Sequence, residues 1–277
     1  KVFGKKVQTD QNGFRIPLDN FTYNKKENYI LVLGDSVTFG VGVEEKNSYI
    51  GILRQKFKKK NILNAAIFGH NLQSYFYIIK KNNKDFKNKI DKVIIFLSLN
   101  DIVPYQGVIF KKNLNQDTIN KSFFESYQKN KFFIKLNVVL REKSSLFVLL
   151  KGLFTKPIKR HYDYMNVLYD SENNLKEFEK YISQITDFSK KNNLNLEFVL
   201  LPYAYQVINN CKEDLLTPQF EIIKIFSKLN LDLKNYTNEF CETPNKNDLF
   251  LKYDPVHLSN YGHKQLSNLL ISDGIFN

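Results

Sequence analysis

Three polar residues have the types needed for nucleophilic catalysis, namely Ser36, Asp254 and His257. A serine hydroxyl is a weak nucleophile unless a base takes its proton, and histidine is the side chain that titrates nearest to neutral pH. Asp254 precedes His257 by three residues across a turn opened by Pro255, so its carboxylate can reach the imidazole Nδ1–H. That contact would leave Nε2 free to accept the serine proton. These residues therefore predict a serine nucleophile, a histidine base and an orienting carboxylate.

The sequence around Ser36 indicates how it would be presented. An apolar run at residues 29–33 predicts a buried strand, and Gly34 lets the backbone turn sharply at its end. Ser36 would then lie at the carboxyl edge of a sheet, where open α/β folds bind their ligands. A simpler interpretation stays open, because Asp35 or Ser36 could merely cap a helix. Asp254 and His257 could likewise be a surface turn beside a chance histidine.

Four short motifs occur in the order found in the SGNH, or GDSL, hydrolase superfamily, and the chain resembles that family from about residue 29 to 270. They are Gly34-Asp35-Ser36, Gly69 within residues 64–71, Asn100-Asp101 after an apolar run, and Asp254-Pro255-Val256-His257. The resemblance implies that Ser36 attacks a carboxylic ester, that His257 moves the proton and that Asp254 orients the ring. It also implies an oxyanion hole made by the backbone N–H groups of Ser36 and Gly69 and by the Asn100 amide. Asp35 and Asp101 are expected to act as supporting or capping residues.

The alternation of apolar strands and amphipathic helices predicts a parallel sheet covered on both faces. Strands are expected at residues 29–33, 61–66, 92–99, 194–201 and 231–233, and helices at 48–58, 72–80, 177–192, 218–229 and 260–271. We therefore predict one domain over residues 1–277, a three-layer α/β/α sandwich of the SGNH or flavodoxin-like kind. Residues 1–28 would form an irregular N-terminal arm. Ser98 stands where the family usually has glycine, which could shift the loop that carries Asn100.

Residues 104–173 match no motif and separate the third strand from the fourth. Apolar clusters alternate there with basic residues, a pattern typical of a helical insert with an apolar face. Three interpretations stay open: a lid over the active site, a surface that lies on a membrane, or a helical subdomain packed on the sheet.

The composition limits the classes of partner and cofactor that we expect this protein to bind. The formal net charge is +13, but the lysines are scattered and no nucleic-acid-binding motif accompanies them, so no nucleic-acid partner is expected. His70, His161 and His263 form no metal-ligand motif, so we expect neither metal nor cofactor. Cys211 and Cys241 could form one disulfide if their Cα atoms lie within about 7 Å.

The sequence favours a serine esterase that removes small O-acyl groups, such as acetyl, from a glycan or similar polar substrate. Two alternatives remain: an O-acetyltransferase acting on a cell-envelope polysaccharide, and a catalytically silent glycan-binding module on the same fold. The stretch Asn12-Gly13-Phe14-Arg15 resembles the lead-in of exported relatives, and the sequence begins without methionine. A periplasmic or membrane-anchored location is therefore expected, although no run of 18 apolar residues occurs in the sequence.

Overall fold

The computed structural model describes residues 4–24, 26–86, 89–103 and 156–276 of the chain. In these residues one sheet of seven strands runs through the molecule in the order β1-β2-β4-β3-β5-β6-β7. The strands are β1 (Gln8–Thr9), β2 (Arg15–Ile16), β3 (Tyr29–Leu33), β4 (Asn61–Asn64), β5 (Ile90–Leu97), β6 (Asn195–Leu200) and β7 (Lys234–Asn235). From β4 to β7 all neighbours pair in parallel, whereas β1 and β2 form an antiparallel edge.

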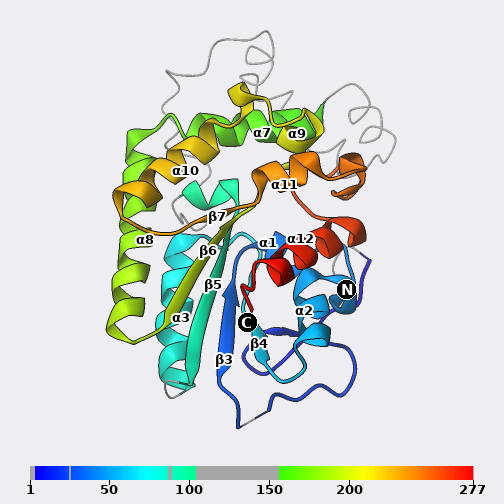
Figure 1. The fold of residues 1–277 in the computed structure, drawn as a ribbon, viewed down its shortest axis with the longest axis vertical. Coiled ribbons are helices and arrows are strands. Elements are labelled where there is room, and N and C mark those ends of the chain that lie inside the picture. The colour runs from blue at the N-terminus through cyan, green and yellow to red at the C-terminus, as the bar shows by residue number, and fades with distance from the viewer. Residues whose placement is uncertain (1–3, 25, 87–88, 104–155, 277) are drawn as a thin grey trace, which may run out of the picture.

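Helices cover both faces of this sheet (Figure 1). The α-helices are α1 (Ser36–Phe39), α2 (Tyr49–Lys56), α3 (Leu72–Asp85), α7 (Pro157–Leu168), α8 (Glu172–Lys191), α9 (Ala204–Ile208), α10 (Thr217–Lys228), α11 (Thr237–Glu242) and α12 (Asn260–Ser272). Short 3₁₀ turns are η1 (Glu45–Asn47), η2 (Leu99–Ile102), η3 (Glu213–Leu215) and η4 (Lys246–Asp248). None of the helices in the described ranges is both long and apolar enough to cross a membrane.

Strand periodicity divides the core into two layers. Leu31 and Leu33 of β3 pack on one side, with residues of α3, α7, α8 and α10. Ile30 and Val32 pack on the other side, with residues of α2, α9, α11 and α12. Successive side chains of a strand point to opposite faces, so a strand apolar throughout must be covered on both. The predicted three-layer α/β/α fold with a central parallel sheet is thus confirmed.

Two predicted elements are wrong. The strand expected at residues 231–233 begins further along the chain. Asn230 adopts a left-handed conformation (φ 51°), and the Leu231 N–H donates to the Phe226 carbonyl, so these residues form the turn that ends α10. Pairing with β6 begins only at Lys234. The expected irregular arm at residues 1–28 contains β1 and β2, which add an antiparallel edge to the sheet.

The predicted insert at residues 104–173 lies largely outside the described residues. Its described part, from residue 156 onward, is helical, as predicted, and comprises α7 and the start of α8. Tyr162 and Met165 of α7 are buried in the layer that contains α3 and α8. This part of the insert therefore packs against the body of the fold.

The N-terminal arm supports the loop that follows Ser36. The Asp10 carboxylate accepts hydrogen bonds from the Asn12 and Phe14 N–H groups (2.8 and 3.0 Å), which fixes the turn before β2. Arg15 is fully buried, and its guanidinium donates to the carbonyls of Gly40 (2.6 Å) and Val43 (2.7 Å). Because a buried guanidinium needs acceptors, the arm and the loop after α1 stabilise each other.

The Cα atoms of Cys211 and Cys241 lie 6.0 Å apart, and the two residues form a disulfide. This distance satisfies the limit of about 7 Å between Cα atoms that a disulfide requires. The bridge joins the chain just after α9 to α11, on the side of the sheet that also contains α12.

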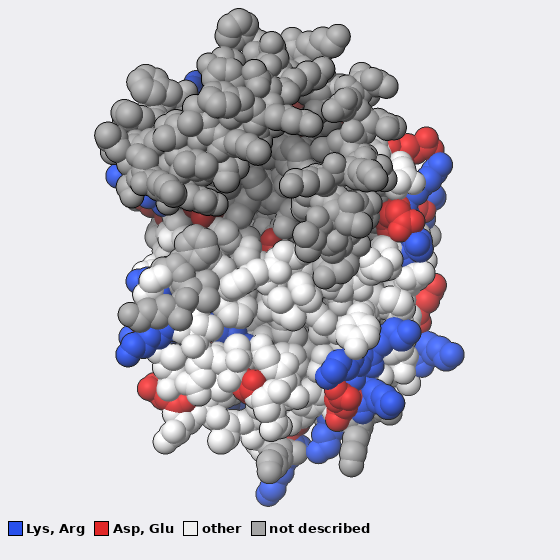
Figure 2. All heavy atoms as spheres, turned by 180° about the vertical axis from the view of Figure 1, so that it is seen from behind, with Lys and Arg blue, Asp and Glu red and all other residues white. Residues whose placement is uncertain are grey.

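Figure 2 shows how charged side chains are placed on one face of the molecule. On the face in Figure 2, lysine and arginine side chains stand mainly toward the edges, with acidic side chains among them and a broad uncharged area between. Several lysines are paired within helices, for example Lys81 with Asp85 at 2.6 Å and Lys159 with Asp163 at 2.7 Å. On this face, the described residues form no continuous basic stripe of the kind that follows a nucleic-acid backbone.

His263 of α12 couples stability to pH. It is fully buried and its Nδ1 accepts a hydrogen bond from the Tyr49 N–H (3.3 Å). Burial, reinforced by the positive charges of Arg15 and His257, lowers the pKa of His263 to about 3. In an unfolded chain the pKa would be about 6.5, so between these values the unfolded state binds more protons and stability falls as pH drops.

From pH 7 to pH 5 we therefore expect His263 to cost the wild type about 2 kcal/mol of unfolding free energy. A His263→Gln variant keeps an acceptor for the Tyr49 N–H but cannot titrate. Urea denaturation of both proteins at the two pH values measures the difference. Equal pH-dependent losses in the two proteins would contradict this assignment.

Candidate active site

Ser36 is the first residue of α1 and is separated from the carboxyl end of β3 only by Gly34 and Asp35. The turn between them requires glycine, because a Cβ on Gly34 would overlap the Thr38 side chain and lie 3.2 Å from the Phe96 carbonyl oxygen. Asp35 caps α1, with its carboxylate accepting a hydrogen bond from the Val37 N–H (2.8 Å). The capping interpretation thus holds for Asp35, and it leaves the Ser36 hydroxyl available for another partner.

That partner is His257. Its Nε2 lies 2.8 Å from Ser36 Oγ, and its Nδ1 lies 2.8 Å from Asp254 Oδ2. The side chains of His257 and Asp254 are only 15% and 19% exposed. The structure thus places the three residues singled out in the sequence in one hydrogen-bonded chain.

The Asp254 carboxylate is fixed by the backbone as well as by the ring. Its Oδ1 accepts from the N–H groups of Val256 (2.9 Å) and His257 (2.8 Å). Burial raises the pKa of Asp254, but the hydrogen bonds from the His257 ring and backbone outweigh it, so the net pKa is lowered. The carboxylate is therefore ionised at neutral pH and favours a proton on Nδ1 of His257.

Backbone hydrogen bonds fix the loop that carries Asp254 and His257. The Leu251 N–H donates to the His257 carbonyl (2.8 Å), and the Ala204 N–H at the start of α9 donates to the Pro255 carbonyl (3.0 Å). The first bond closes the loop on itself, and the second joins it to the segment that follows β6. The carboxyl ends of β3 and β6 thus both contribute to placing the three residues.

Asn100 belongs to η2, just after β5. Its Nδ2 donates to Asp35 Oδ2 (3.1 Å), which brings it beside the Ser36 turn. Asp101 accepts from the Ser98 N–H (2.8 Å) and from the Tyr75 hydroxyl (2.9 Å), so it secures the η2 turn. Burial raises the pKa of both Asp35 and Asp101, and the charge of Asp35 adds to the shift at Asp101.

Gly69 lies in the loop between β4 and α3, at a left-handed φ of 67°. No atom of the described residues lies within 4 Å of a Cβ built there, so the left-handed backbone conformation is what favours glycine. The Ile67 N–H of the same loop donates to the Gly34 carbonyl (3.2 Å). The loop of Gly69 is thereby tied to the turn that presents Ser36.

Two residues near the site were not predicted. Tyr203 is buried and its hydroxyl donates to Asn100 Oδ1 (3.1 Å). The His161 ring of α7 packs on the Tyr203 ring at 5.5 Å. Burial lowers the pKa of His161, and the charge of Asp254 opposes that shift. The available signal for Tyr203 was an aromatic residue directly after a strand ended by Pro202, at the same sheet edge as Ser36.

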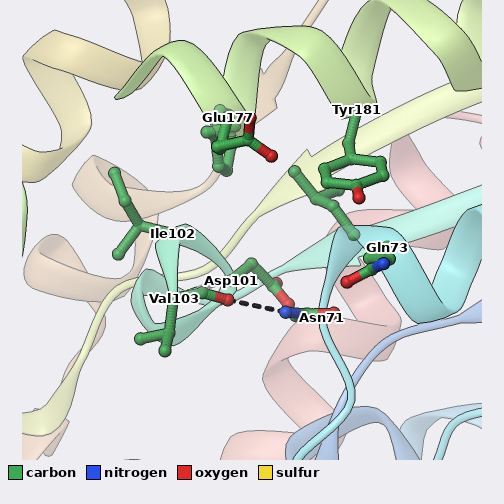
Figure 3. Close-up of a pocket in the computed structure, with 9 residues that line it drawn as sticks. Asn71, Gln73, Asp101, Ile102, Val103, Glu177 and Tyr181 are labelled. Atoms are coloured by element: carbon green, nitrogen blue, oxygen red, sulfur yellow. Dashed lines mark hydrogen bonds between the residues drawn. The ribbon is translucent and has the colours of Figure 1, made fainter. Parts of the chain in front are cut away.

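A small pocket adjoins η2 on the side of α3 and α8 (Figure 3). Asn71, which caps α3, donates through its Nδ2 to the Val103 carbonyl (2.6 Å) across this pocket. Asp101 and Tyr181 also line it, whereas Ser36 and His257 do not.

Within the described residues, no group of three or more His, Cys, Asp and Glu side chains is placed to hold a metal ion.

Comparison with known proteins adds information at the level of the fold. Neither a family model nor a curated protein matches the sequence. Among solved structures, the psychrotrophic esterase EstA from a Pseudoalteromonas species superposes with a TM-score of 0.50 at 12% identity, covering 91% of this chain and 100% of EstA. A putative lipolytic protein of the G-D-S-L family from Desulfitobacterium hafniense gives 0.47 at 14% identity, covering 88% and 100% of the two chains. The chain therefore shares its fold with the esterase EstA, and this fold is the three-layer α/β/α sandwich that the sequence predicted.

Proposed function

We propose that this protein is a serine hydrolase of carboxylic esters, with Ser36 as nucleophile, His257 as general base and acid, and Asp254 as the residue that orients His257. One observation supports this most directly: the unbroken chain from Ser36 Oγ to His257 Nε2 and from His257 Nδ1 to Asp254, with both contacts at 2.8 Å. A serine and a base within hydrogen-bond reach, with the base oriented by a third group, is the arrangement that activates a hydroxyl.

In the proposed reaction Ser36 Oγ attacks the ester carbonyl carbon while its proton passes to His257 Nε2. The tetrahedral intermediate collapses, the C–O bond to the alcohol breaks, and His257 returns the proton to the leaving oxygen. Water then attacks the acyl-serine by the same steps and releases the acid. Asp254, whose lowered pKa keeps it ionised, stabilises the imidazolium formed twice in each cycle.

The oxyanion of the tetrahedral intermediate would be bound by the Ser36 and Gly69 backbone N–H groups and by the Asn100 side-chain amide. Support comes from the placement of Asn100 beside the Ser36 turn through Asp35, and from the bond between the Gly69 loop and Gly34. Donors fixed before the reaction stabilise the developing charge without a reorganisation cost.

For the substrate we propose small O-acyl groups, such as acetyl, on a glycan or similar polar alcohol. The described side chains near the three residues include Asn100, whose amide lies beside the Ser36 turn, and His161, which is close enough to Asp254 for that charge to shift its pKa. Both have polar atoms suited to an alcohol rich in hydroxyl groups. Transfer of the acyl group to a sugar hydroxyl would proceed through the same acyl-serine, so the acceptor must be determined separately.

With nitrophenyl esters of increasing chain length, we expect kcat/KM to be highest for acetate and to fall toward laurate. The reason is that the polar Asn100 and His161 side chains beside the proposed catalytic residues favour a small acyl group on a polar alcohol. Stopped assays should measure free acid and, with a sugar present, acylated sugar. A steady rise of kcat/KM from acetate to laurate would contradict the proposed substrate class, and acyl-sugar as the main product would assign the protein as a transferase.

We further propose that the full protein works outside the cytoplasm, in the periplasm or anchored at the membrane. The disulfide between Cys211 and Cys241 supports this, because disulfides persist mainly in oxidising compartments. We expect the full-length protein, expressed in its native cells, to fractionate with the periplasm or envelope and to resist thiol alkylation unless first reduced. Recovery from the cytoplasm with two alkylated cysteines would contradict the proposal.

A further inference from the structure

Both ends of the Asn100 side-chain amide are held by buried partners. Its Nδ2 donates one hydrogen to Asp35 Oδ2 (3.1 Å), and its Oδ1 accepts from the Tyr203 hydroxyl (3.1 Å). A primary amide has two N–H donors, and among the described residues only one of them has an acceptor. The two contacts together define the plane of the amide and hence the direction of the remaining N–H.

Tyr203 is itself rigidly placed. It is only 2% exposed, and its backbone N–H donates to Gln206 Oε1 (2.9 Å). Gln206 is fully buried and exchanges hydrogen bonds with Gln219 of α10 (2.7 and 3.0 Å). The His161 ring of α7 packs against the tyrosine ring. The hydroxyl is therefore held by α7, α9 and α10, which lie beyond the carboxyl ends of β5 and β6 in Figure 1.

The direction of the hydrogen bond follows from the chemistry of the groups. Burial raises the pKa of Tyr203 well above its ordinary value, so the hydroxyl keeps its proton at all working pH values. It can then donate to Asn100 Oδ1. If the amide turned over, its oxygen would face the acceptor Asp35 Oδ2, so Asp35 selects the observed orientation. In that orientation the Tyr203 hydroxyl donates to Asn100 Oδ1 and holds the amide from its other end.

We propose that Tyr203 is a positioning residue for the oxyanion hole: its hydroxyl fixes the Asn100 amide so that the free N–H points at the charge that develops on the substrate carbonyl. This inference rests on the proposed function. Tyr203 would act only through Asn100, and its effect would appear when the charge develops. Its removal should therefore lower kcat and leave KM nearly unchanged.

The test is a double-mutant cycle on nitrophenyl acetate hydrolysis. Tyr203→Phe, which removes only the hydroxyl, is expected to lower kcat about tenfold in the wild-type background, less than the roughly hundredfold loss typical of deleting an oxyanion donor. In an Asn100→Ala background the same change should lower kcat by less than about twofold, because the group on which it acts is gone. An equal loss in both backgrounds, or no loss in the wild type, would overturn the inference.

Tyr162→Phe is the matched control. The Tyr162 hydroxyl is also hydrogen-bonded to protein oxygens, the Leu215 carbonyl (2.7 Å) and Asn166 Oδ1 (3.1 Å), and neither of them belongs to Asn100. Both Phe variants should lower the melting temperature by similar amounts, but only Tyr203→Phe should lower kcat, with assays run below both melting temperatures. A wild-type kcat for Asn100→Ala would refute the oxyanion role in the proposed function. A loss for Asn100→Ala with no loss for Tyr203→Phe would refute only the positioning role.

Discussion

Replacement of Ser36 by alanine is expected to lower kcat for nitrophenyl acetate by a factor on the order of 10⁴ to 10⁶. The reason is that Ser36 Oγ is the atom that lies 2.8 Å from the base His257 and would form the acyl bond. A fluorophosphonate probe, which reacts with activated serines, should label the wild type and leave Ser36→Ala unlabelled. The melting temperature should change little, because Asp35 and not Ser36 supplies the cap of α1.

Ser227→Ala serves as the control for this experiment. Ser227 lies on the exposed face of α10, and its substitution should affect neither labelling nor hydrolysis. Equal labelling of wild type and Ser36→Ala would show that another residue reacts with the probe and would remove Ser36 from the proposed mechanism. Because the probe reports the nucleophile directly, this result does not depend on knowing the natural substrate.

The sheet could be predicted from the sequence where burial alone determines the pattern. The uniformly apolar β3 and the apolar residues 93–97 of β5 are covered on both faces, and glycine follows β3 because a Cβ would overlap Thr38. The two-residue strands β1, β2 and β7 were missed or misplaced. Their residues have no strand pattern of their own, and they are strands only because an edge of the larger sheet pairs with them.

The candidate active site also contains residues that could be predicted from the sequence and residues that could not. The residues with distinctive chemistry, Ser36, Asp254 and His257, could be identified from type and order, and the structure brings them together. Tyr203 could not be identified from the sequence, because a tyrosine after a strand is most often a core residue. Its significance depends on which atom its hydroxyl reaches, and that is set by packing among α7, α9 and α10. The structural role of Arg15 could not be predicted for a similar reason, because its hydrogen-bond acceptors are backbone carbonyls, which any residue type provides.

The structure also predicts how Asp254→Asn would fail. Asp254 Oδ1 accepts two backbone N–H groups, those of Val256 and His257, so the amide oxygen of asparagine should occupy that position. The amide nitrogen must then face His257 Nδ1, which becomes an acceptor and moves the ring proton to Nε2. A protonated Nε2 cannot take the proton of Ser36, so kcat is expected to fall by about 10⁴.

The two hydrogen bonds from the backbone to Asp254 Oδ1 allow the loss of activity to be measured separately from a loss of stability. Asp254→Asn keeps both acceptor contacts and should melt close to the wild type, whereas Asp254→Ala removes both and should be less stable by about 1–3 kcal/mol. Asp163→Asn, which breaks only the exposed ion pair with Lys159, controls for loss of a carboxylate and should leave kcat and the melting temperature nearly unchanged. Hydrolysis of nitrophenyl acetate and thermal melting measure the two effects. An unchanged kcat for Asp254→Asn at an unchanged melting temperature would mean that His257 needs no orienting carboxylate.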